Sequence, residues 1–367
     1  MSVSFRNFVA CGLLLLAVSV TLAYAAGDPA VTEPAAERSG YELDAAWPAY
    51  PEGMAFEMGS GVAVDAEGVV YLFTRDIEHW AAHPLAMSAK MGKSSVSMFD
   101  KDGTYLGKWG PSDEPGFALG AHTIYIDAQG MFWTVDRDGH IVKKYSPEGE
   151  LLLTLGTFAK PGDGPDQLNG PTAVVVQNNG NLVVSDGYWN SRLVFYTPEG
   201  EFIKSVGKWG RGPAEFNTVH AMAQTADGRL LVVDLCGGTL HSYMTIPGQI
   251  VDYRHDRAPD CQGRIQVLDA DGNYLEEWTH IMPLSIAVYG NRIYASDKMR
   301  NLAILDDQTG DVLERVDSLA IYIHQMAMSP DGDIYTASVY PEHAGEKRGP
   351  EGPSHHRWSR NLAQQQD

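Results

Sequence analysis

Short apolar runs recur along the chain, and the turns between them repeatedly contain Asp-Gly, Asn-Gly or Glu-Gly. Glycine adopts the positive φ that tight hairpin turns require, and runs rich in Val, Ile, Leu and Tyr between such turns are typical of β-strands. One unit of the pattern is strand, turn, strand, short link, strand, turn and strand. The pattern therefore predicts an all-β chain built from four-stranded antiparallel units.

This unit recurs six times with a period of about 50 residues, and a repeat of four short strands is typical of a β-propeller blade. The first strands of the six copies begin near Gly61, His122, Pro171, His220, Leu284 and His324. We predict a six-bladed β-propeller over residues 41–340. A disordered leader over residues 26–40 would precede it, and a polar, partly disordered segment over residues 341–367 would follow it.

The sixth copy lacks a clear second half because the chain becomes polar and rich in Gly and Pro after Val339. The stretch from Tyr41 to Pro51 can supply a closing strand from the N-terminal side. Such closure would remove the exposed strand edges that an open ring leaves.

Residues 1–25 have the pattern of an export signal. Arg6 provides the positive charge, Val9 to Leu22 form the apolar stretch, and Ala23 to Ala25 form a small-x-small cleavage motif. The apolar stretch is too short to span a bilayer comfortably. We therefore expect cleavage after Ala25, export to a periplasm or the extracellular space, and no membrane association afterwards.

Removal of the signal leaves two cysteines, Cys236 and Cys261. An even pair in an exported protein predicts a disulfide that closes the loop between them. Two free buried thiols are the alternative.

The formal net charge of −20 limits the choice of partners. So acidic a surface repels phosphate backbones, and no cluster of Lys and Arg provides the basic footprint that nucleic-acid binding requires. We expect a monomer that takes a small-molecule or peptide substrate and no nucleic acid.

Three of the 12 histidines begin first strands at equivalent positions. His122, His220 and His324 belong to the second, fourth and sixth copies and are separated by 98 and 104 residues. The first strand of each blade lines the central channel, so three imidazoles from alternate blades should converge on the axis. A three-histidine set with an open position suits catalytic zinc, and imidazole also binds other divalent transition metals. Three separate structural histidines are the alternative.

Two further side chains are expected on the same face. Arg75 ends the second strand of the first copy, and Tyr188 follows the second strand of the third. Because the second strand runs antiparallel to the first, a residue past its end returns to the face of the histidines. Tyrosine can act as a general base when nearby positive charges lower its pKa, and arginine can hold a carboxylate by two hydrogen bonds. Rim positions without a chemical role are the alternative for both.

The segment SDGYWNSR, Ser185 to Arg192, resembles the S-D-G-Y-x-N-S-R motif of the peptidyl-α-hydroxyglycine α-amidating lyase family and its bacterial NHL-repeat relatives. The segments FNTVH and GRIQVLD are also similar, and the resemblance runs from Tyr41 to about Val339. It implies an NHL-type propeller in which Tyr188 and Arg75 are catalytic. The zinc ligands that it implies are His122, His220 and His324.

The chain departs from this family in two places that concern the site. A second family arginine falls in the fourth blade, where this chain has Val233 to Cys236 and then an insertion up to Gln262, so Arg257 is the candidate replacement. The family's M-P-H-D is Tyr322 to Gln325 here, and the resemblance links the missing aspartate to a structural calcium. We therefore do not expect calcium.

The resemblance implies a carbon–nitrogen lyase that splits a peptidyl-α-hydroxyglycine into a peptide amide and glyoxylate. In that hypothesis the metal polarises a substrate oxygen, Tyr188 takes the hydroxyl proton, and Arg75 orients the substrate. A related reaction on a small amide-like substrate is one alternative. The other is a non-catalytic exported propeller that binds a protein, peptide or glycan through the insertion Leu235 to Gln262.

Overall fold

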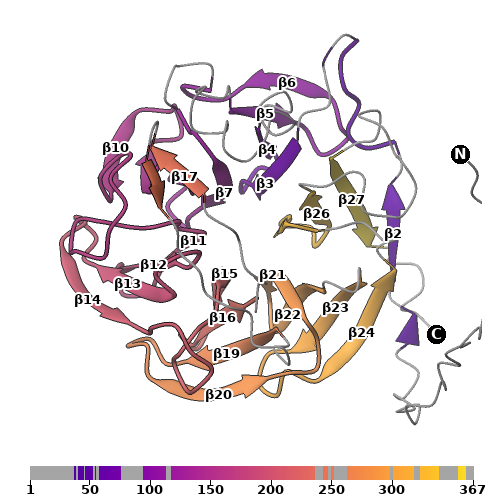
Figure 1. Cartoon of the computed structure of the whole chain (residues 1–367). Coiled ribbons are helices and arrows are strands. Elements are labelled where there is room, and N and C mark those ends of the chain that lie inside the picture. The colour runs from indigo at the N-terminus through magenta and orange to yellow at the C-terminus, as the bar shows by residue number, and fades with distance from the viewer. Residues whose placement is uncertain are drawn as a thin grey trace, which may run out of the picture. The chain divides into compact units, whose positions relative to one another are not determined.

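The computed structural model describes residues 37–38, 40–44, 46–52, 54, 58–75, 94–112, 117–235, 243–246, 249–251, 263–297, 301–317, 323–338 and 354–360. These residues form a two-stranded hairpin and six sheets that are antiparallel apart from one short added strand, with no helix among them (Figure 1). Consequently no described helix is long and apolar enough to cross a membrane.

Each of the first three sheets has its four strands in chain order. The first contains β3 (Met58–Val64), β4 (Val70–Arg75), β5 (Ser95–Phe99) and β6 (Tyr105–Lys108). The second contains β7 (Ala121–Ile126), β8 (Phe132–Asp136), β9 (Ile141–Tyr145) and β10 (Leu151–Leu155). The third contains β11 (Ala173–Val176), β12 (Leu182–Asp186), β13 (Arg192–Tyr196) and β14 (Phe202–Val206).

The fourth and fifth sheets each carry an addition. The fourth contains β15 (Val219–Gln224), β16 (Leu230–Asp234), β19 (Arg264–Leu268) and β20 (Tyr274–Trp278). Its insertion holds the hairpin of β17 (Tyr243–Ile246) and β18 (Gln249–Val251). The fifth contains β21 (Pro283–Tyr289), β22 (Arg292–Asp297), β23 (Asn301–Asp306) and β24 (Val312–Asp317). The short β1 (Glu37–Arg38), from the predicted leader, pairs with β24 in parallel.

The sixth sheet joins both ends of the domain. It contains, from the inside outward, β25 (Gln325–Met328), β26 (Ile334–Ala337), β27 (His355–Arg360) and β2 (Tyr41–Asp44). The N-terminal strand β2 closes the blade, as the sequence predicts. The third strand, β27, comes from the polar segment placed after the propeller. Its sequence, HHRWSR, has a single large apolar side chain, the buried Trp358, so it lacks the apolar pattern of the other strands.

The six sheets form a closed ring. Neighbouring innermost strands contact one another in the order β3, β7, β11, β15, β21 and β25, and β25 contacts β3 in turn. Six apolar clusters form the core, and each contains residues from two neighbouring sheets. The predicted six-bladed β-propeller is therefore confirmed.

The turns after β3 and β7 share one construction, in which an aspartate accepts two backbone N–H groups, and the turn after β7 shows it well. Asp127 Oδ1 accepts hydrogen bonds from the backbone N–H groups of Gln129 and Met131, both at 2.9 Å. Gly130 supplies the positive φ of 76° that the turn requires. Such side-chain bonds mimic a backbone turn, so they fix the hairpin register and the end of the blade at which each first strand begins.

Candidate metal centre

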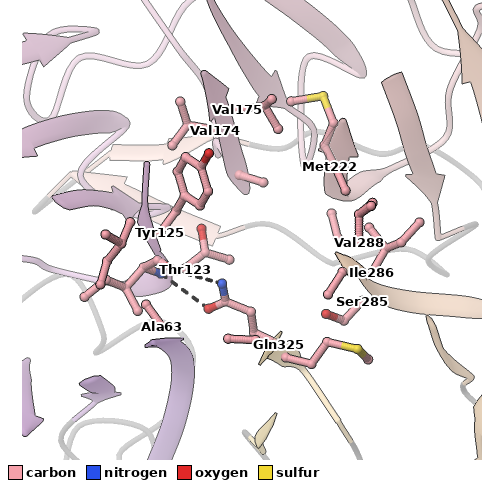
Figure 2. Close-up of a pocket in the computed structure, with 18 of the residues that line it drawn as sticks. Ala63, Thr123, Tyr125, Val174, Val175, Met222, Ser285, Ile286, Val288 and Gln325 are labelled. Carbon is pink, nitrogen blue, oxygen red and sulfur yellow. Dashed lines mark hydrogen bonds between the residues drawn. The ribbon is translucent and has the colours of Figure 1, made fainter. Parts of the chain in front are cut away.

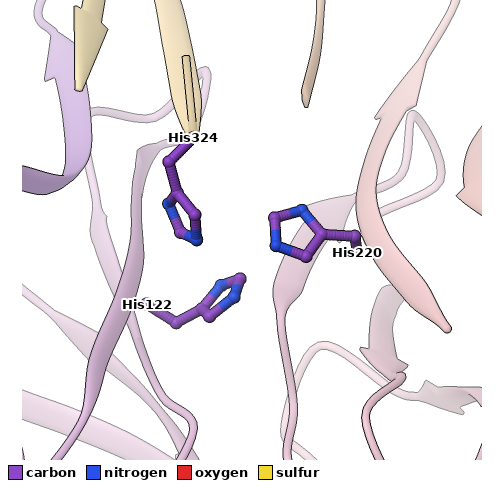
Figure 3. Close-up of side chains that lie close together, drawn as sticks. All are labelled: His122, His220 and His324. Atoms are coloured by element: carbon purple, nitrogen blue, oxygen red, sulfur yellow. The ribbon is translucent and has the colours of Figure 1, made fainter. Parts of the chain in front are cut away.

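The three predicted histidines lie close together, with their rings turned toward one another (Figure 3). His122 lies in β7, His220 lies in β15, and His324 directly precedes β25. Their ring centroids are 4.7, 4.9 and 5.0 Å apart, and a potential ligand nitrogen of each lies within 4.8 Å of the others. At most 5% of each residue is exposed. Among the described residues, this is the only cluster of three or more side chains able to hold a metal ion.

Each imidazole is oriented by the main chain of the blade that follows it. The Nδ1 acceptors are Thr172 O for His122 at 2.8 Å, Leu284 O for His220 at 2.8 Å and Ser60 O for His324 at 2.6 Å. A carbonyl oxygen can only accept, so each Nδ1 carries the ring proton and each Nε2 keeps its lone pair. Anchoring of this kind fixes the tautomer and ring direction of metal-binding histidines.

The surroundings keep the imidazoles of His122 and His324 neutral. Burial, followed by the neighbouring histidines and the charges of Arg75 and Arg137, lowers the pKa of His122 well below its usual value. The pKa of His324 is also lowered well below the usual value, first by burial. Metal ions bind the neutral imidazole, so the three side chains fit a divalent metal in both chemistry and direction.

Tyr188 lies beside the histidines, as the sequence predicts. Its hydroxyl group is 3.2 Å from His122 Nε2, and its ring centroid is 6.0 Å from that of His220. Because Nδ1 of His122 carries the ring proton, the phenol is the donor in the contact with Nε2. A potential proton carrier therefore lies directly at the centre.

Most of the SDGYWNSR segment is a scaffold for Tyr188. Asp186 accepts hydrogen bonds from Asn190 Nδ2 at 2.6 Å and Arg192 Nε at 2.9 Å, which holds the loop closed. Gly187 is required because a Cβ there would lie 1.8 Å from the carbonyl oxygen of Val219, the residue before His220. The loop thus packs directly against the strand that carries His220.

Arg75 also reaches the centre. It is buried at the end of β4, and its Nε donates a hydrogen bond to the carbonyl of Ala121, the residue before His122. A guanidinium charge is therefore fixed beside the ligands, where it contributes to the lowered pKa of His122 and His324.

Arg137, which the sequence argument missed, joins these residues. It follows β8 and is buried, and its Cζ lies 5.4 Å from the centroid of the Tyr188 ring. The signal was available, because the position after a second strand drew attention to Arg75 and Tyr188 and applies equally to the second blade.

Gln325 links three blades next to His324. Its Oε1 accepts hydrogen bonds from the N–H groups of Val62 at 3.1 Å and Ile124 at 3.3 Å, and its Nε2 donates to the carbonyl of Ile124 at 2.8 Å. It borders a cavity of about 450 Å³ that the innermost strands and His220 line. Figure 2 shows Gln325 among the side chains that line this central cavity. Gln325, a neutral amide, therefore stands where the family has its aspartate. That the chain binds no calcium stays a prediction.

Several predictions concern residues outside the described part of the chain. They are the signal over residues 1–25, the pairing of Cys236 with Cys261, and the candidate Arg257. The described part of the fourth blade does contain Arg264, but this side chain is paired with Asp234 and Glu277.

Six blades around a buried three-histidine centre define the chain as a β-propeller with a candidate metal site. No family model matches it. It is 23% identical over 308 residues to a probable peptidyl-α-hydroxyglycine α-amidating lyase of Caenorhabditis elegans, covering 79% of this chain and 82% of that protein. It is 31% identical over 210 residues to human NHL repeat-containing protein 3, covering 54% of this chain and 55% of that protein.

A third relative is the mouse peptidyl-glycine α-amidating monooxygenase, 23% identical over 299 residues, or 77% of this chain and 29% of that protein. The chain thus matches only about half of the human relative and under a third of the mouse one. The predicted resemblance to amidating lyases and NHL-repeat proteins is confirmed.

Solved structures agree on the fold. A streptogramin B lyase structure superposes with a TM-score of 0.50 at 11% identity, covering 87% of this chain and 97% of that one. The WD40 propeller domain of Doa1 gives a TM-score of 0.50 at 13% identity, covering 90% of this chain and 100% of that one. At such identities the likeness concerns the propeller alone.

Proposed function

We propose that this protein is an exported zinc-dependent lyase that converts a peptidyl-α-hydroxyglycine into a peptide amide and glyoxylate. One observation carries the proposal. In each of the three histidines Nδ1 donates to a main-chain carbonyl, which leaves Nε2 able to bind a metal. The Tyr188 hydroxyl group lies 3.2 Å from one of these atoms, His122 Nε2. The names of the amidating-lyase relatives support a peptide-like substrate, and the signal-like N-terminus supports export.

The ligands would be His122, His220 and His324, and a divalent metal there would supply a Lewis acid for a substrate oxygen. With the Nε2 lone pairs taken up by the metal, Tyr188 would lose the acceptor of its hydroxyl group and, as the phenolate, would accept the proton of the substrate hydroxyl group. The carbon–nitrogen bond then breaks, the carbonyl of glyoxylate forms, and the departing amide nitrogen takes up the proton that Tyr188 has accepted, so the proton balance closes. Arg75 places positive charge next to this change. The reaction consumes no water.

The first test is elemental analysis of the purified mature protein, beside His220→Ala and the control His280→Ala. His280 is a half-exposed side chain whose Nε2 lies 4.0 Å from Asp311. We expect about one zinc per chain in the wild type and the control, and a loss of at least tenfold in metal affinity for His220→Ala. If another divalent transition metal is found at this stoichiometry, only the identity of the metal in the proposal changes. Absence of metal after reconstitution would favour the non-catalytic binding propeller.

The second test measures glyoxylate release from an N-acyl-α-hydroxyglycine. Tyr188→Phe should lower kcat by about 10²- to 10⁴-fold and leave the metal content unchanged, because it removes only the proton-accepting oxygen. Tyr289→Phe is the matched control, since Tyr289 donates to the carbonyl of Pro330 away from the histidines. Full activity of Tyr188→Phe would exclude the tyrosine from the reaction.

A further inference from the structure

We propose that Arg137, held in place by Asp138, recognises the carboxylate of the substrate and makes the site specific for the free acid. The inference rests on the proposed function, because it takes the substrate to be an N-acyl amino acid whose carboxylate adjoins the reacting carbon. It adds a specificity-determining residue from the second blade, in a position that the family motif does not mark and that the sequence argument passed over.

Arg137 is held rigidly. Its backbone N–H donates to the carbonyl of Gly120 at 3.0 Å. Its Nε and Nη2 donate to the two carboxylate oxygens of Asp138 at 2.7 and 2.9 Å. This fork-to-fork pair sets the plane of the guanidinium, and a guanidinium with five donors can serve a second anion besides the first.

The Asp138 carboxylate is itself fixed by close packing. A Cβ on Gly120 would lie 2.2 Å from Asp138 Oδ2, so glycine is required for the carboxylate to lie against this loop. Burial opposes ionisation of Asp138, but the charges of Arg137 and Arg75 outweigh it and lower the pKa of this carboxyl group. Asp138 is therefore an anion that can anchor Arg137.

Arg137 also lies close to the residues of the candidate centre. Its Cζ is 5.4 Å from the centroid of the Tyr188 ring, and the Tyr188 hydroxyl is 3.2 Å from His122 Nε2. Arg75 approaches the same histidine through Ala121. In a chain with a net charge of −20, two buried guanidinium groups therefore form an arginine site beside the histidines, with the Asp138 carboxylate paired to Arg137.

The chemistry of the reaction calls for such a site. The hydroxyl-bearing carbon is bonded to a carboxylate, which is fully ionised at neutral pH. Arginine forms paired hydrogen bonds with carboxylates, whereas an ester or a primary amide lacks the charge. A rigid arginine one side chain away from the tyrosine can thus select the acid and hold its hydroxyl-bearing carbon near the centre.

The kinetic test compares an N-acyl-α-hydroxyglycine with its methyl ester on the zinc-loaded protein. Arg137→Gln should lower kcat/KM for the acid by about 10- to 100-fold, mainly through KM, and leave the ester nearly unaffected. Arg137→Lys should recover part of the loss. Equal losses on acid and ester would mean a merely structural role and would overturn the inference.

A binding test separates this inference from the proposed function. N-benzoylglycine has the carboxylate but no hydroxyl group to react, and its affinity can be compared with that of N-benzoylglycinamide by titration calorimetry, with and without zinc. We expect the wild type to prefer the acid by about tenfold and Arg137→Gln to lose the preference. A wild type without preference, or a preference kept by Arg137→Gln, would overturn the inference even if the lyase is active.

The opposite result is equally informative. A wild type that releases no glyoxylate but prefers the acid through Arg137 would uphold the carboxylate site and refute the lyase. Arg229→Gln is the matched control, because Arg229 also pairs with a nearby aspartate, Asp227, but in the turn at the other end of its blade. This variant should keep the preference, and urea unfolding of both variants checks the fold.

Discussion

At the scale of single residues, the site is defined as much by main-chain oxygens as by side chains. The histidines were predictable because they occupy the same place in alternate repeats. Their acceptors, such as Thr172 O and Ser60 O, were not, since any residue provides a carbonyl. Arg137 is different, because its sequence position held the necessary signal.

His140 illustrates how a single buried group can make the site's surroundings sensitive to pH. Its Nδ1 accepts the N–H of Gly170 at 3.1 Å, so the ring proton is on Nε2, which is buried without a described partner. Burial lowers its pKa to about 4. Since the unfolded chain binds the proton at higher pH, the stability contribution is complete above about pH 6.5 and is lost as the pH falls towards 4.

We therefore expect His140→Asn to flatten the acid side of the stability profile. Asparagine retains an acceptor near the place of Nδ1 and tolerates the φ of 57° at this position. Between pH 7 and pH 4, the variant should lose less unfolding free energy than the wild type, by on the order of 3 kcal/mol. Urea unfolding at several pH values measures this, and parallel profiles of the two proteins would contradict it.

At the scale of strands and loops, turn chemistry and apolar alternation were enough to place most blades. The strand β27 was missed because it has a polar sequence and is held by its neighbours β26 and β2. The tyrosine-bearing loop was recognisable by its motif, yet its dependence on a neighbouring strand is visible only in three dimensions. Gly187 looks like an ordinary turn glycine until the carbonyl of Val219 is placed against it.

The close approach of this loop to β15 leads to a prediction. Gly187→Ala forces a methyl group against the Val219 carbonyl, so the loop and the His220 strand must separate. We expect a loss of about 2–3 kcal/mol in unfolding free energy and a lowered metal affinity. Gly164→Ala is the control, because its Cβ would meet only the end of the flexible Gln167 side chain, at 3.1 Å. Equal stability of the two variants would argue against the tight contact.

At the scale of the whole molecule, the closed ring follows from the sequence because six similar units must bury their faces against one another. The seam of the ring, which is the sixth sheet where the N-terminal β2 joins the C-terminal strands, could be predicted only in part. The outermost strand could be assigned to the N-terminal side, but the third strand comes from beyond the segment over residues 339–353, across which no repeat pattern continues.

Truncation tests the seam. A chain that ends at residue 354 lacks β27, and with it the buried Trp358, so β2 loses its partner and β26 gains an open edge. We expect a loss of at least about 3–5 kcal/mol in unfolding free energy and association through the open edge. A chain that ends at Arg360 is the control. Thermal unfolding and size-exclusion chromatography compare them, and matching behaviour would show that the seam needs no third strand.

The anchoring of His324 by Ser60 O joins the last blade to the first across this seam. One of the three candidate ligands is therefore correctly oriented only when the chain has brought its two ends together. A metal ion at the centre would bind the closed ring in preference to any open form, and would stabilise it by mass action. Metal binding would then be the last step of folding, and the protein could not become active before the ring of six blades has closed.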